Sequence, residues 1–142
     1  MTDQLNRVLV AEDHLASRQL LERYLARWGY QVMVASDGSE ALRLMELPGA
    51  PCIALVDCLI PCVNGVEVCR RIRSQRERPY QYLMILTVNN APDEIRGLEE
   101  GGADDCVVKP FVLDELRARV RLAQRVVALE RKVAEMAVES RS

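Results

Sequence analysis

Five short apolar runs alternate with amphipathic stretches along the chain, and this order constrains the fold more than any other feature. The runs are residues 7–11, 31–35, 52–56, 82–86 and 106–108. They are continuously apolar, which is typical of strands covered on both faces and therefore of a parallel sheet. The stretches between them carry apolar residues at helical spacing. The pattern predicts βαβ units with right-handed crossovers and helices on both faces of the sheet.

Turn and capping residues divide the amphipathic stretches into predicted helices. They are expected from residue 15 to Trp28, after Asp37 as far as Pro48, after Asn64, at 91–98 on Ala91, Ile95 and Leu98, and from Leu113 onward. With 142 residues, the chain has room for one domain built from these elements.

The composition restricts the compartment and the partners. No apolar run approaches the ~20 residues that cross a bilayer, and the first residues lack the order of a signal peptide. We therefore expect a cytoplasmic protein with five reduced cysteines and no membrane contact. Residues 117–142 are basic, but acidic side chains interrupt them and no aromatic residue lies among them. We expect no nucleic-acid binding by this domain.

Polar side chains follow four of the five runs. Glu12 and Asp13 follow the first, Asp57 the third, Thr87 the fourth and Lys109 the fifth. In a doubly wound sheet these positions converge at the carboxyl edge, where ligands bind. Clustered carboxylates repel one another unless a cation lies among them, and Mg²⁺ prefers such oxygen ligands. Carboxylates, Mg²⁺, an ammonium and a hydroxyl together predict an aspartyl-phosphate site.

Four segments in order resemble the response regulator receiver domains of two-component signalling, including the chemotaxis response regulator. They are VLVAED at 8–13, LVDCLIPCVNG at 55–65, LTVNN at 86–90 and GADDCVVKP at 102–110. The resemblance covers about residues 6–124. It implies a flavodoxin-like α/β fold, a five-stranded parallel doubly wound sheet of strand order 2-1-3-4-5. It also implies a signalling module rather than a turnover enzyme.

The same resemblance assigns roles to the residues at the sheet edge. Asp57 would accept a phosphoryl group from a histidine kinase or phosphotransfer protein. Glu12, Asp13, Asp57 and the backbone carbonyl of Leu59 would hold Mg²⁺ or Mn²⁺. Thr87 and Lys109 would bind the phosphoryl group, and the Lys109–Pro110 peptide would be cis. Asp104 and Asp105 match the family's turn before the last strand and are expected to be structural.

Three positions depart from the family pattern. Cys106 stands at the switch position, where most receivers carry Tyr or Phe, and a thiol is too small to act as an aromatic rotor. Val88 stands where the family usually has Ala or Gly, and its stiff side chain should narrow access to the phosphoryl pocket. Leu59 cannot hydrogen-bond a hydrolytic water. We therefore expect slow self-dephosphorylation and poor use of small phosphodonors.

The helix that begins at Leu113 carries a heptad-like stripe near its end. The stripe comprises Leu122, Val126, Leu129, Val133 and Met136. Val at a and Leu at d favour a parallel two-stranded coil, in which Arg125 would face Glu130 of the partner. We expect a receiver domain at 1–124, a helical extension or coiled-coil linker at 125–142, and a homodimer. The stretch resembles linkers that lead to output domains such as diguanylate cyclase. An overhang that frays or folds back is the alternative.

Two other functions fit parts of the pattern. A receiver-like interaction module that works without phosphorylation would explain Cys106 and Val88, but the intact acidic, Thr and Lys set argues against it. A flavin-binding doubly wound domain would need a phosphate loop after the first strand. That position holds Glu12 and Asp13 instead, which would repel a phosphate.

Overall fold

The computed structural model describes residues 5–88 and 100–140. Its centre is a five-stranded, all-parallel sheet in the order β2-β1-β3-β4-β5, which confirms the expected flavodoxin-like topology. The strands are β1 (Arg7–Ala11), β2 (Gln31–Ala35), β3 (Ile53–Asp57), β4 (Tyr82–Thr87) and β5 (Asp105–Val108).

Four helices complete the described fold: α1 (Leu15–Arg27), α2 (Gly38–Met45), α3 (Gly65–Arg73) and α5 (Leu113–Glu139). The helix expected on Ala91, Ile95 and Leu98 lies outside the described residues.

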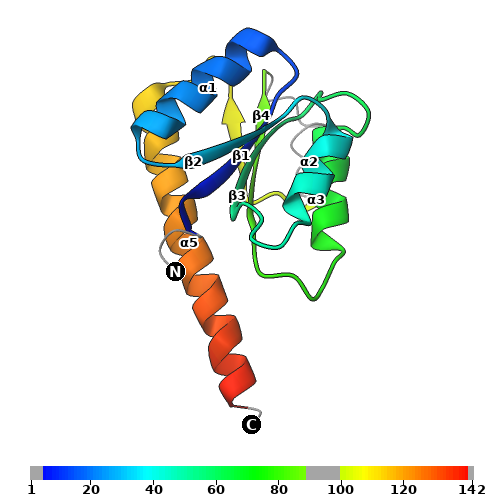
Figure 1. The fold of residues 1–142 in the computed structure, drawn as a ribbon, viewed down its shortest axis with the longest axis vertical. Helices are drawn as coiled ribbons and strands as arrows, with labels where there is room; N and C mark the ends of the chain where they lie inside the picture. The colour runs from blue at the N-terminus through cyan, green and yellow to red at the C-terminus, as the bar shows by residue number, and fades with distance from the viewer. Residues whose placement is uncertain (1–4, 89–99, 141–142) are drawn as a thin grey trace.

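The helices cover both faces of the sheet. α1 and α5 lie on one face, and α2 and α3 lie on the other (Figure 1). Successive strand residues point to opposite faces, so Val8 and Val10 of β1 face α1 and α5, while Leu9 faces α2 and α3. Both sides of the central strands are therefore buried, which explains why the sequence shows continuous apolar runs.

Capping side chains start three of the helices. The caps are His14 for α1, Asp37 for α2 and Asn64 for α3, and each accepts a hydrogen bond from the backbone N–H three residues later. This contact satisfies one of the four N–H groups that a helix start leaves without an intrahelical partner. The caps therefore fix where each helix leaves the edge of the sheet.

Gly65 lets α3 begin directly against the end of β3. A Cβ at Gly65 would lie 2.6 Å from the carbonyl oxygen of Asp57 and 2.9 Å from the Cα of Cys58. The Gly65 N–H also donates to the Cys58 carbonyl at 3.0 Å. Any larger residue at 65 would therefore push α3 away from Asp57.

The strand ends differ slightly from those predicted. Asp57 and Thr87 are the last residues of their strands, and β3 begins at Ile53 rather than Cys52. Asp105, expected in the turn before the last strand, is instead the first residue of β5 and is paired with Met84. In these strands the backbone pairing with the neighbouring strand continues one residue beyond the apolar run, onto a polar residue. An apolar run alone therefore does not mark the end of the strand.

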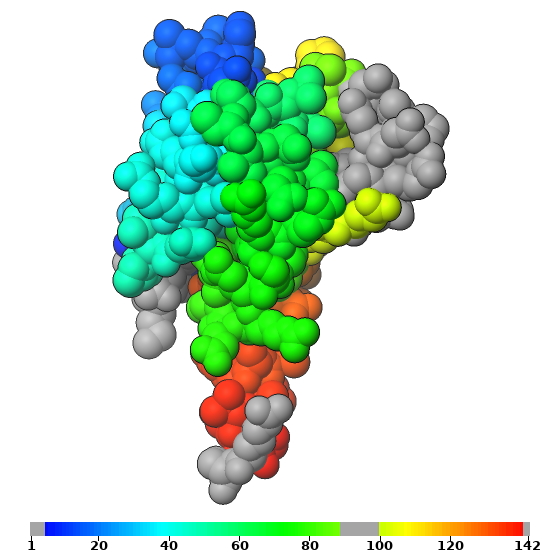
Figure 2. All heavy atoms as spheres, turned by 90° about the vertical axis from the view of Figure 1, so that its right-hand side faces the viewer, coloured from blue at the N-terminus to red at the C-terminus, as the bar shows by residue number. Residues whose placement is uncertain are grey.

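α5 extends well beyond the sheet. Figure 1 shows its last turns projecting from the body of the domain, and Figure 2 shows them emerging beneath the face where α2 and α3 lie side by side. The helix passes the predicted division at residue 124 without a break: Val127 is fully buried and the Arg131 Nε donates to the Tyr80 carbonyl at 3.1 Å. Within residues 5–88 and 100–140, none of the helices combines the length and the apolarity of a membrane span.

Candidate phosphoacceptor site

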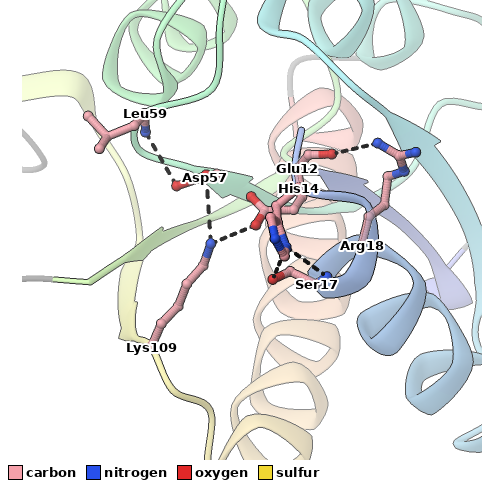
Figure 3. Close-up of polar contacts among 7 residues, drawn as sticks. All are labelled: Glu12, His14, Ser17, Arg18, Asp57, Leu59 and Lys109. Carbon is pink, nitrogen blue, oxygen red and sulfur yellow. Dashed lines mark hydrogen bonds and ion pairs between the residues drawn. The ribbon is translucent and has the colours of Figure 1, made fainter.

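Strand register brings the polar residues to one edge of the sheet. Ala11 pairs with Val56, so Glu12 and Asp57 follow side by side on neighbouring strands. On the other side of β4, the Lys109 N–H donates to the Thr87 carbonyl at 2.7 Å. Figure 3 shows the Glu12, Asp57 and Lys109 side chains pointing toward one another from three separate segments.

Three carboxylates lie within reach of one ion. Glu12, Asp13 and Asp57 each offer an oxygen atom, and these atoms all lie within 4.8 Å of one another. Glu12 is buried, Asp57 is half-buried and Asp13 is exposed, so the cluster opens to solvent on the Asp13 side. This arrangement is the one that the strand-end pattern predicts.

Lys109 is the cation of this cluster. Its Nζ lies 2.8 Å from Glu12 Oε1 and 3.7 Å from Asp57 Oδ2 (Figure 3). The ammonium therefore pairs more closely with Glu12 than with Asp57. The Lys109–Pro110 peptide bond is cis, as the resemblance implies.

One positive charge does not balance the cluster. Burial, the largest cause, and the nearby Asp57 carboxylate together raise the pKa of Glu12 to about 7, although Lys109 acts in the opposite direction. The second carboxylate oxygen of Glu12, Oε2, is buried without a hydrogen-bond partner among the described residues. An additional cation beside Glu12 would favour its ionised form.

The donor set suits a magnesium ion. It consists of hard carboxylate oxygens, one of them with no protein donor, around an opening to solvent. Mg²⁺ typically binds through one or two carboxylates and keeps several waters. Leu59, whose carbonyl is expected to join this set, places its backbone N–H 3.3 Å from Asp57 Oδ1 and exposes its side chain.

The remaining expected positions surround the cluster. Thr87 is buried at the end of β4, and Val88 after it is 67% exposed at the rim. Asn89 and Asn90 of the LTVNN segment lie outside the described residues. Cys106 is half-buried and packs against the apolar cluster under α2 and α3. The switch position therefore holds a small packed thiol.

Two residues that support the loop after β1 were not identified from the sequence. The Arg18 Nη1 donates to the Glu12 carbonyl at 3.0 Å, which ties the loop after β1 to α1. His14 caps α1 through Nδ1 (Figure 3). A polar residue directly before a helical run, with Ser17 three positions later, was the available signal for the cap.

The chain matches known proteins along most of its length. The profile of the response regulator receiver domain matches residues 8–121. A probable transcriptional regulator ycf27 of Cyanophora paradoxa is 39% identical over 115 residues, which are 81% of this chain and 46% of the relative. The chain thus spans about half the length of the curated relatives it matches.

Solved structures agree with this match. One is the receiver domain of the sensor histidine kinase PA1611 from Pseudomonas aeruginosa PAO1, which has a magnesium ion in its active site cleft; the TM-score is 0.77, the identity 27%, and the coverage 84% of this chain and 97% of the other. Another is a probable two-component system response regulator/GGDEF domain protein, with a TM-score of 0.80, 27% identity, and coverage of 89% and 52%. This chain belongs to the response regulator receiver domain family of two-component signal transduction.

Proposed function

We propose that Asp57 accepts a phosphoryl group from a histidine kinase or a phosphotransfer protein, in a reaction that requires Mg²⁺ or Mn²⁺. The main support is the Asp57 carboxylate itself. It is half-buried beside two further carboxylates, with the Lys109 ammonium 3.7 Å from its Oδ2. A nucleophilic oxygen next to a metal-type donor set and a lysine ammonium is the arrangement that phosphoryl transfer requires.

Each residue has a distinct part in this transfer. An Asp57 oxygen forms the new bond to phosphorus while the phosphorus–nitrogen bond of the donor phosphohistidine breaks, and the electron pair leaves with the imidazole. Glu12, Asp13, Asp57 and the Leu59 carbonyl would hold the metal, which neutralises charge on the phosphoryl oxygens when bound. Lys109 would turn from Glu12 toward a phosphoryl oxygen, and the Thr87 hydroxyl would donate to another.

A groove next to the site offers a place for the donor protein. It has a volume of about 390 Å³ and lies between α1 and the segment after β5. It is lined by Ser17, Leu20, Tyr24, Lys109, Pro110, Phe111 and Leu113. Leu20 is 44% exposed there, so an amphipathic helix of the kinase could bury it within reach of Asp57.

The output is the second part of the proposal. One relative is a probable transcriptional regulator, and one structural neighbour is a probable response regulator/GGDEF domain protein. We propose that residues 1–124 work as the receiver and 125–142 as a helical linker, in a homodimer that switches a partner or an output domain such as a diguanylate cyclase. The small thiol of Cys106 would give this switch a smaller moving part than an aromatic ring.

Intact-mass measurement tests the phosphoacceptor. The chain is treated with a cognate kinase, and separately with a small phosphodonor, in Mg²⁺ or in chelator. With the kinase we expect a gain of one phosphoryl group in Mg²⁺, its loss in chelator and its loss in Asp57→Asn. The small phosphodonor should modify the chain poorly, because Val88 narrows access to Asp57. Asp114→Asn, an exposed aspartate at the start of α5, is the control and should still be modified. Persistence of the gain in Asp57→Asn would move the acceptor elsewhere.

Val88 and Cys106 favour a second candidate, an interaction module that works without phosphorylation. Val88 is exposed at the rim of the site, where a branched side chain restricts small donors. Beryllofluoride binding in Mg²⁺ separates the two candidates, because it depends on Asp57 and the metal but on no donor enzyme. Absence of both beryllofluoride binding and kinase-dependent mass gain would support the second candidate.

A further inference from the structure

α5 has two apolar faces: one is buried against its own domain, and the other is exposed except at Val126, which packs against the core. Leu116, Val120, Ala123 and Val127 are fully or almost fully buried against the sheet. The second face is the exposed stripe: Leu122, Val126, Leu129, Val133 and Met136. Leu122, Leu129, Val133 and Met136 of the stripe are 53–63% exposed, and Val126 is half-buried at its inner margin.

The exposed stripe points away from the domain. At about 100° per residue, its mean direction lies roughly 130° around the helix from the buried face. Its last residues also lie on the part of α5 that projects beyond the sheet (Figure 1). A second helix can therefore approach the exposed residues of the stripe, most freely along the projecting segment.

The stripe is complementary to a second copy of itself. With Val126 and Val133 at a positions, like residues meet across a parallel pair and form continuous apolar layers. Arg125 then occupies g and faces the partner's Glu130 at e, so each side of the seam carries an attractive pair. In an antiparallel pair, Arg125 would instead lie near the partner's Lys132, which would repel it. Both Arg125 and Glu130 are exposed and available for this contact.

The exposed residues of the stripe take no part in the buried face that holds α5 against the sheet. Their orientation therefore does not depend on whether Lys109 pairs with Glu12 or turns toward Asp57. We propose that two copies pair in parallel through the stripe whether or not Asp57 is phosphorylated. This proposal rests on the homodimer of the proposed function. It means that Asp57 is phosphorylated in a dimer that has already formed.

Sedimentation velocity tests the constitutive pairing. The wild-type chain and Asp57→Asn should both sediment as dimers, with and without beryllofluoride and Mg²⁺. The double variant Leu129→Glu/Val133→Glu should raise the dimer dissociation constant at least about tenfold, because charges in an apolar seam cost well over the ~1.4 kcal/mol that a tenfold change represents. A wild-type chain that is monomeric at all concentrations, or dimeric only with beryllofluoride, would overturn the proposal.

Val138→Glu is the matched control. Val138 is an exposed apolar residue of the same projecting segment, but it lies roughly 160° around the helix from the stripe. This variant should remain dimeric. Equal loss of the dimer in both variants would show that charge anywhere on the helix end disrupts association, which contradicts a specific stripe.

Charge reversal tests the orientation. Arg125→Glu and Glu130→Arg should each weaken the dimer roughly two- to fivefold, and the combined variant should recover wild-type affinity. Strengthening by Arg125→Glu would show antiparallel pairing, because it would place a glutamate near the partner's Lys132.

The proposed dimer and the proposed phosphoacceptor can be refuted independently. Leu129→Glu/Val133→Glu should still gain one phosphoryl group by intact mass, since the stripe lies away from the site, and circular dichroism should show its helix content retained. A chain that dimerises but takes no phosphoryl group refutes only the proposed function. A chain that takes the phosphoryl group as a monomer refutes only the standing dimer.

Discussion

At Glu12, burial and charge act against each other. The side chain is 1% exposed, one oxygen accepts from Lys109 at 2.8 Å, and the other has no partner among the described residues. Its neighbours Asp13 and Asp57 carry the same charge. In the absence of metal, the folded state must therefore hold a carboxylate that burial and repulsion both disfavour.

Glu12→Gln is expected to separate stability from metal binding. The amide removes one charge from the cluster and can still accept from Lys109, so in chelator at pH 8 the free energy of unfolding should rise by about 1 kcal/mol. The Mg²⁺ dissociation constant should rise by roughly tenfold, because a ligand charge is lost. Urea denaturation measures the first quantity, and isothermal calorimetry measures the second.

Glu135→Gln supplies the reference, because it makes the same chemical change at an exposed position of α5. It should alter neither quantity. A Glu12→Gln protein that is less stable than wild type in chelator would show that the ion pair with Lys109 outweighs burial and repulsion.

Among the elements, the junction of β4 and β5 depends on a single carboxylate. Asp104 accepts a hydrogen bond from the Leu83 N–H at 2.8 Å and another from the Tyr80 hydroxyl at 2.6 Å. It also forms an ion pair with Arg73 of α3. Burial, together with this hydrogen bond to Asp104, holds the pKa of Tyr80 well above its usual value. One side chain thus joins α3, β4 and the segment before β5.

Asp104→Ala should lower the free energy of unfolding by about 2–3 kcal/mol, since it leaves the Leu83 N–H without its acceptor and removes the carboxylate partner of the half-buried Arg73 guanidinium. Chemical denaturation with a fluorescence or circular dichroism signal gives the value. Glu77→Ala, at an exposed carboxylate in the loop after α3, should change it by less than about 0.5 kcal/mol. An Asp104→Ala loss no larger than this control would remove the carboxylate from its structural role.

The order of strands and helices could be predicted from the sequence because strands buried on both faces are apolar at every position. The run at residues 82–86 is apolar throughout, and all of β4 is buried. The convergence of Glu12, Asp57, Thr87 and Lys109 followed from the rule that parallel strands end at one edge. Their positions in the structure agree with that rule.

Pairing within the site was not readable from sequence. Nothing in the spacing says that Lys109 lies nearer to Glu12 than to Asp57, because this depends on side-chain conformation and on which carboxylate is more buried. Periodicity also cannot show which apolar stripe of a helix faces its own domain. Val127 is buried although it lies outside the heptad stripe, and α5 therefore contacts the domain past residue 124.

For the molecule as a whole, burial of ionisable groups sets a limit on alkaline stability. Burial raises the pKa of Cys69 from 9.0 to about 12 and that of Tyr82 from 10.0 to about 12. Cys69 is fully buried under α3, and Tyr82 is 6% exposed at the start of β4. Neither lies in the phosphoacceptor cluster.

These raised pKa values give the stability a definite dependence on pH. Between about pH 9 and 12 the unfolded chain loses protons that the folded chain keeps, so the stabilisation present below pH 9 declines as the pH rises. Each group contributes a slope of up to about 1.4 kcal/mol per pH unit.

Urea denaturation at pH 8, 9.5 and 10.5 in a reducing agent should show a falling free energy of unfolding. Cys69→Ala should be less stable at pH 8 but lose less over this range, while Cys62→Ala, at an exposed thiol, should keep the wild-type slope. An equal slope in Cys69→Ala would contradict this prediction. It would mean that the Cys69 thiol ionises as readily in the folded protein as in the unfolded chain, despite its burial beneath α3.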